Sequence, residues 1–106
     1  MTDPDPVFEA LADPTRRAVI RALADEGPTT LSALSRELPI SRQAVAKHLV
    51  VLQDAGLVEG SGPVRGRVYT FTPRPLTDAM DWMVDVGAGW DDRLARLKQQ
   101  VERRTR

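Results

Sequence analysis

Ser41-Arg42-Gln43-Ala44-Val45-Ala46-Lys47-His48-Leu49 is the stretch of sequence that decides the fold. Serine is a good N-cap residue, so we expect a helix to begin there and to run to Ala55, with Gly56 as its C-terminal stop. At about 100° per residue, the side chains of this helix divide into two faces. The outward face holds Arg42, Gln43, Ala46, Lys47 and Val50, and the inward face holds Val45, His48, Leu49 and Leu52.

A shorter helix is expected directly before this one. Thr29 and Thr30 offer a cap for a helix that carries three leucines. Pro39 ends this helix, and only one residue separates Pro39 from Ser41. Two helices that meet across such a tight turn predict a helix-turn-helix. In that motif the second helix lies in the DNA major groove, and the first helix braces it across the backbone.

The outward face of the second helix predicts DNA contact. Arginine, lysine and glutamine side chains pair with guanine and adenine edges in the major groove. The same polar side chains could form an ordinary solvated face, and a winged-helix protein-interaction module is the alternative function. Such a module would place apolar residues there, so we favour sequence-specific binding of double-stranded DNA. The expected contacts from this helix are Ser41, Arg42, Gln43, Ala46 and Lys47.

Two runs of β-forming residues, 57–59 and 68–72, flank a glycine-containing segment and predict a hairpin after the two helices. A hairpin in this position is a wing, and we expect Arg65 and Arg67 to contact phosphate or the minor groove, although they could be ordinary loop charges. The net charge of the chain is zero, but six basic residues stand against three acidic ones between residues 36 and 74. This local excess favours a DNA-binding surface in the middle of the chain.

The two ends of the chain are expected to be helical. Helical spacing predicts a helix from Val7 to Ala12 and a second one that Asp13 caps before Pro14. A last helix, about residues 75–104, has apolar residues at alternating four- and three-residue spacings, as in a heptad repeat. The residues of this repeat are Leu76, Met80, Met83, Gly87, Trp90, Leu94, Leu97 and Val101.

The heptad repeat predicts a homodimer. A single domain of 106 residues, 42% of them hydrophobic, has a small core for a monomer, and the apolar stripe would leave large side chains exposed. Gly87 either marks a close crossing of two helices or breaks the last helix near Gly89. The expected dimer interface consists of Phe8, Leu11, Leu76, Met80, Met83, Gly87, Trp90, Leu94 and Leu97.

Residues that could support metal or enzyme chemistry are scarce. The chain has no cysteine and a single histidine, His48, which we expect to pack inward and not to bind a metal. Asp78, Asp81 and Asp85 could hold a hard cation, but we favour a solvated acidic face. No nucleophile with a positioned base and no phosphate-binding motif is visible, so we expect no enzyme activity, cofactor or metal. No leader-like or membrane-spanning stretch is visible either, and we expect a soluble cytoplasmic protein.

Residues 11–17, 41–49 and 52–58 resemble the ArsR family of bacterial winged-helix repressors, and residues 90–97 are similar to a metal-free branch of that family. The resemblance implies a mainly α fold with a small β-hairpin, and one domain over residues 1–106. It also implies dimerisation through the first and last helices and binding to an inverted-repeat operator until a signal arrives. The metal sensors of the family use cysteines near the third helix, or histidine and carboxylate ligands on the last helix. Those cysteines and histidines are missing here, so we expect a repressor that does not respond to metals.

Overall fold

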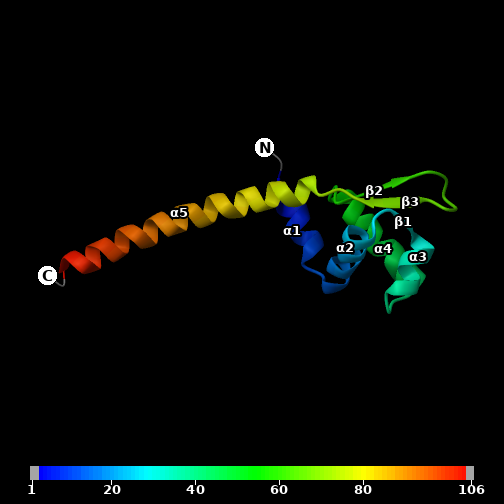
Figure 1. Ribbon diagram of the computed structural model, residues 1–106, viewed down its shortest axis with the longest axis horizontal. Helices are drawn as coiled ribbons and strands as arrows, with labels where there is room; N and C mark the ends of the chain where they lie inside the picture. The colour runs from blue at the N-terminus through cyan, green and yellow to red at the C-terminus, as the bar shows by residue number, and fades with distance from the viewer. Residues whose placement is uncertain (1–2, 105–106) are drawn as a thin grey trace.

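The computed structural model describes residues 3–104 and shows a compact body with one long helix projecting from it (Figure 1). The overall extents are 71 × 30 × 20 Å, and most of the length comes from the last helix. The elements in chain order are α1 (Asp5–Leu11), α2 (Pro14–Glu26), β1 (Thr29–Thr30), α3 (Leu31–Glu37), α4 (Arg42–Asp54), β2 (Val58–Ser61), β3 (Val68–Phe71) and α5 (Arg74–Arg104). The predicted fold class, mainly α with a small β-hairpin in a winged helix-turn-helix, is confirmed.

The core lies where α2, α3 and α4 meet the small sheet. Each of these helices contributes leucine or valine side chains with almost no exposure to solvent, and burying one such side chain stabilises the fold by about 1.5–3 kcal/mol. The largest fully buried side chains are Leu23, Leu34, Leu49, Leu52, Leu57, Val19 and Val45. This packing holds α4 rigidly against the body by its inward face.

Both ends of α4 are fixed as the sequence predicts. The Ser41 hydroxyl oxygen accepts a hydrogen bond from the Ala44 amide at 3.1 Å and caps the first turn. At the other end, Gly56 has a φ of +75°, which favours glycine. Its amide donates to the Gln53 carbonyl at 2.9 Å, and the Leu57 amide donates to the Leu52 carbonyl at 2.9 Å, which together form a Schellman motif.

The sheet has three strands, whereas the sequence predicted only a hairpin. The strand order is β1-β3-β2, and both pairs are antiparallel. Thr29 pairs with Tyr69 and Thr30 with Val68, while the Thr30 hydroxyl also caps α3 by accepting from the Ala33 amide at 3.2 Å. A two-residue strand carries no alternation that a sequence pattern could reveal, so β1 was missed.

The first helix begins at Asp5, two residues earlier than expected. Pro4 is its N-cap residue and Pro6 lies in its first turn, where the amide that proline lacks has no helical partner. Val7 and Ala10 are buried against the body, and the Phe8 ring meets the Trp82 ring of α5 edge to face, with 5.5 Å between centroids. Helix α1 therefore lies between the body and the beginning of α5, as Figure 1 shows.

The last helix is continuous from Arg74 to Arg104, so the alternative of a break near Gly87 and Gly89 is wrong. Ala79, near its beginning, is buried to 1% exposure, and beyond its first turns the helix projects away from the body (Figure 1). The expected helix at about 75–104 is thus present as one continuous helix. No helix in the described part of the chain is long and apolar enough to cross a membrane.

Candidate DNA-binding surface

Helix α4 presents the face that the sequence predicts. Arg42, Gln43 and Lys47 are exposed, whereas Val45, Leu49 and Leu52 on the opposite side are at most 1% exposed. Ala46 and His48 are half-buried at the borders between these two faces. The expected inward position of His48 is therefore only partly right.

The Ser41 side chain has a structural role in addition to its predicted place at the surface. Its hydroxyl caps α4, and the residue remains exposed. The first turn of α4 also carries amide groups without helical acceptors, and the helix dipole makes this end electropositive. The beginning of α4 is thus suited to an anionic neighbour such as a phosphate.

The two arginines of the wing have different surroundings. Arg65 is exposed near the tip of the loop between β2 and β3. The Arg67 guanidinium instead turns back across the hairpin and donates to the carbonyls of Gly60, at 3.1 Å, and Gly62, at 3.3 Å. Arg67 therefore links the two sides of the wing, and no sequence pattern distinguishes it from Arg65.

Gly60 makes this bridge sterically feasible. A Cβ atom at residue 60 would lie 2.5 Å from the Arg67 Nε, which is closer than real Cβ atoms come, and 3.0 Å from the Gln53 Nε2, which is a tight contact. The absence of a side chain at Gly60 lets the guanidinium cross the strand beside α4. Arg67 of the wing and Gln53 near the end of α4 thus both lie next to the position that a Cβ atom at Gly60 would occupy.

The structure brings the helix and the wing together around one small hollow. Arg42 of α4 and Arg67 of the wing both line a cavity of about 130 Å³. Ser32 of α3 and Val64 at the tip of the wing line it as well. One predicted contact residue from each element, Arg42 and Arg67, thus lies beside the same hollow.

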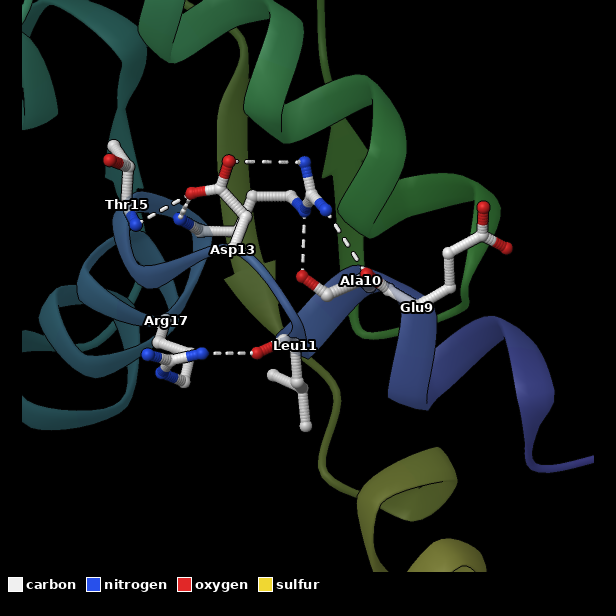
Figure 2. A network of polar contacts seen from close by, with 7 residues as sticks. Glu9, Ala10, Leu11, Asp13, Thr15 and Arg17 are labelled. Atoms are coloured by element: carbon white, nitrogen blue, oxygen red, sulfur yellow. Dashed lines mark hydrogen bonds and ion pairs between the residues drawn. The ribbon is translucent and has the colours of Figure 1, made fainter.

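The junction between α1 and α2 contains a polar network that sequence reasoning missed (Figure 2). The Asp13 carboxylate accepts from the amides of Thr15, at 2.7 Å, and Arg16, at 3.2 Å. The Arg16 guanidinium in turn donates to the carbonyls of Ala10, at 2.6 Å, and Glu9, at 3.1 Å. Arg16 thereby satisfies the last carbonyls of α1 and ties that helix to α2.

Charge and hydrogen bonding at this junction lower the pKa of Asp13. The hydrogen bond from the Arg16 amide is the largest cause, and the Thr15 amide and the positive charge of Arg16 act in the same direction against partial desolvation. The Arg16 and Asp13 side chains also form an ion pair at 3.7 Å. The Asp-Pro pair was predicted to start α2, but nothing in the sequence pattern pointed to Arg16 as the partner of α1.

The predicted dimer residues fall into two groups. Phe8, Leu11 and Leu76 are partly buried against the core of the same chain. Along α5, the large apolar side chains of the heptad repeat are 45–57% exposed, namely Met80, Met83, Trp90, Leu94, Leu97 and Val101. Six of the twelve exposed large hydrophobic side chains of the described residues thus belong to this stripe.

The acidic residues of α5 do not form an evident metal centre. Asp78, Asp81 and Asp85 line an open hollow together with Arg74 and Trp82. Within residues 3–104, no three histidine, aspartate or glutamate side chains are grouped so that they could hold a metal ion.

Comparison with known proteins identifies the family. A helix-turn-helix domain family matches residues 11–61. An HTH-type transcriptional regulator of Mycobacterium tuberculosis is 47% identical over 73 residues, which cover 69% of this chain and 67% of the relative. An uncharacterised HTH-type regulator of Bacillus subtilis is 38% identical over 87 residues, covering 76% of this chain and 95% of the relative. A solved ArsR-like transcriptional regulator from a Rhodococcus species is 40% identical, with a TM-score of 0.82 over 91% of this chain and 90% of that one.

The chain belongs to the ArsR family of winged helix-turn-helix transcriptional regulators. A second ArsR family regulator of known structure has a TM-score of 0.74 and 32% identity, covering 82% of this chain and 89% of that one. The predicted family and the predicted class of DNA-binding transcriptional regulator are therefore confirmed. These relatives are named as transcriptional regulators.

Proposed function

We propose that this ArsR-family protein is a homodimeric repressor that binds an inverted-repeat operator through α4 and the wing. The observation that carries the proposal is the division of α4. Its inward face is locked into the core by Val45, Leu49 and Leu52, while Arg42 and Lys47 project from the first turns of the other face. A rigid helix with long donors near its beginning is suited to the major groove.

Each predicted contact then has a distinct role. Arg42 and Gln43 donate to base edges, and Lys47 contacts a base or a phosphate one turn further along α4. The small side chains of Ser41 and Ala46 allow a close approach to the groove. Arg65 contacts phosphate, and the Arg67 bridge fixes the wing that carries it.

The homodimer follows from the exposed stripe on α5. A stripe of this length on a monomer in water would be costly, and covering it with a second copy removes that cost. Two-fold symmetry matches the two α4 helices to the half-sites of an inverted repeat separated by whole turns of DNA. A variant that loses dimerisation is thus expected to lose operator binding as well.

Repression without metal control is the regulatory part of the proposal. A similar Bacillus subtilis protein, 28% identical over 79 residues, is named a transcriptional repressor. An arsenic resistance regulator of Pseudomonas putida is also similar, at 28% identity over 90 residues. This chain has no cysteine to bind arsenite, and its single histidine lies half-buried in α4.

Selection of bound sequences from a random pool of double-stranded DNA tests the proposal. We expect an inverted repeat to be enriched, and we expect the Arg42→Ala and Lys47→Ala variants to bind it more weakly. If Arg42 contacts a guanine, its loss should weaken binding by about 1–3 kcal/mol and relax the preference at one position in each half-site. Arg96→Ala, which removes an exposed positive charge from α5, is the matched control and should bind normally.

Two results would contradict the proposal. In the first, no sequence is enriched, and added salt abolishes the binding of all DNA sequences equally. This result would indicate a protein-interaction module or a nonspecific DNA-binding protein. Normal operator binding by both the Arg42 and Lys47 variants would show that α4 does not lie in the major groove.

A further inference from the structure

Two hollows adjoin where the beginning of α1, the end of α4 and the beginning of α5 come together. The first, of about 460 Å³, lies between the residues that lead into α1 and the first turns of α5. The second, of about 370 Å³, lies between α1, the end of α4 and the start of α5. They share Asp3, Pro4 and Asp78, so they form one groove, which we call the α1 groove. Each hollow alone has the volume of a small-molecule site, commonly about 300–1,000 Å³.

The lining of the α1 groove combines apolar surface with negative charge. Its apolar side chains are those of Pro4, Pro6, Val7, Ala55, Pro75 and Trp82. Its charged side chains are those of Asp3, Asp54, Asp78, Asp81, Asp85 and Arg74. In residues 3–104 no ion pair involves any of these five aspartates, so no described cation neutralises them by direct contact. A cleft lined mainly by one sign of charge attracts ligands of the opposite sign, and here the complementary ligand is a cation.

Trp82 gives the α1 groove an aromatic wall. Its ring meets the Phe8 ring edge to face, yet the residue is 46% exposed. Asp78 and Asp85 stand four residues before it and three residues after it, which places them one helical turn away on the same face of α5. An indole face attracts organic cations, and the flanking carboxylates act in the same direction. Because no three acidic groups in the described residues are placed to hold one metal ion, this arrangement suits a larger cation with apolar surface of its own.

The α1 groove lies away from the apolar stripe of the heptad repeat. At about 100° per residue, the residues of α5 that line the first hollow are centred on the side of the helix opposite the stripe. A second α5 packed on the stripe would therefore leave this side of the helix open. The groove is thus compatible with the proposed homodimer and separate from its expected interface on α5.

We propose that the α1 groove binds a hydrophobic organic cation, and that this ligand changes the affinity of the protein for its operator. The apolar lining takes the body of the ligand, and Trp82 with the surrounding carboxylates takes its positive charge. The bound ligand contacts α1, the end of α4 and the start of α5, so it favours whichever arrangement of these elements fits it better. The effect on the operator rests on the proposed repressor function, whereas the binding of the cation does not.

Two ions of matched shape and opposite charge, tetraphenylphosphonium and tetraphenylborate, test the binding. In isothermal titration calorimetry with the full chain, we expect the phosphonium ion to bind about tenfold more tightly than the borate ion. A double variant, Asp81→Asn with Asp85→Asn, removes two carboxylates of the groove and should weaken phosphonium binding about fivefold or more. The matched control, Asp91→Asn with Asp92→Asn, removes two exposed carboxylates of α5 outside the groove and should bind normally.

Three results of this experiment would overturn the binding site. Equal affinity for the two ions would show that the charge of the groove does not select its ligand. Equal affinity of the two double variants for the phosphonium ion would show that the ion binds elsewhere, for example on the apolar stripe. Absence of phosphonium binding to the unmodified protein would contradict the proposal directly.

Gel shifts with the operator obtained by selection test the effect on DNA binding. A phosphonium concentration that saturates the unmodified protein should change its operator affinity about fivefold or more, and should change that of the variant at Asp81 and Asp85 clearly less. An unchanged operator affinity of the saturated protein would refute the regulatory role of the groove. Failure to select any operator would contradict the proposed repressor function instead, because the calorimetry needs no DNA and tests the groove by itself.

Discussion

Arg16→Ala should destabilise the fold more than its position between two surface helices suggests. The Arg16 side chain is 18% exposed, and its guanidinium donates to the Ala10 carbonyl at 2.6 Å and the Glu9 carbonyl at 3.1 Å. A hydrogen bond from a charged group contributes about 1.5–3 kcal/mol where water is excluded, and much less where water can replace it. The Ala10 bond is partly buried, whereas the Glu9 bond and the ion pair to Asp13 are more open to solvent. We therefore expect a loss of about 2 kcal/mol in the free energy of unfolding.

Urea unfolding followed by far-ultraviolet circular dichroism measures this loss. All samples are kept at one protein concentration, because the proposed dimerisation would add to the apparent stability. The matched control is Arg17→Ala, since Arg17 is exposed and makes one hydrogen bond in the same network, to the Leu11 carbonyl at 2.6 Å. We expect the Arg17 variant to lose clearly less. If the two variants unfold at the same urea concentration, the connection from Arg16 to α1 does not stabilise the fold as argued.

Three further predictions concern pH, the wing and metals. The lowered pKa of Asp13 means that its carboxylate stabilises the fold fully above the ordinary pKa of about 3.9, and that this contribution disappears as the pH falls through the lower folded value. Asp13→Asn should therefore flatten the acid end of the stability profile, and an unchanged profile below pH 4 would contradict this. Arg65→Ala should reduce the slope of operator affinity against salt concentration by about one phosphate contact. Arg67→Ala should weaken operator binding and leave this slope unchanged. Equal slopes for the two variants would show that Arg65 and Arg67 do not differ in role as proposed. One equivalent of zinc, cadmium or arsenite should leave the operator complex intact in a gel shift, and specific release by any of them would show a metal site.

The helix-turn-helix could be predicted because its signals are local. The cap at Ser41, the stop at Gly56 and the alternation of buried and exposed residues between them all lie within one helix and its ends. Each is a property of backbone geometry that a short stretch of sequence determines. The heptad repeat of α5 is local in the same sense, which is why the helix was found, although its continuity through Gly87 was left open.

The features that were missed depend on contacts between residues of different elements. Strand β1 exists because Thr29 and Thr30 reach β3, some forty residues further along the chain. Arg67 differs from Arg65 because the carbonyls of Gly60 and Gly62 lie within its reach. Bonds from side chains to distant backbone carbonyls leave no periodicity in the sequence, so the sequence alone could not reveal them.

In the proposed dimer, α1 connects the dimer interface to the DNA-binding surface. Helix α5 contacts the body mainly through α1, which packs on α2 and α4 as well and places Phe8 against Trp82. The C-terminal carbonyls of α1 are held by Arg16 and Arg17, so the direction in which α5 leaves the body depends on the junction that Asp13 caps. In a two-fold dimer, that direction also sets the spacing between the two α4 helices, because each body is fixed to its own α5. The segment from residue 11 to residue 17, which contains none of the predicted DNA contacts, would thus control which spacing of half-sites the proposed dimer binds.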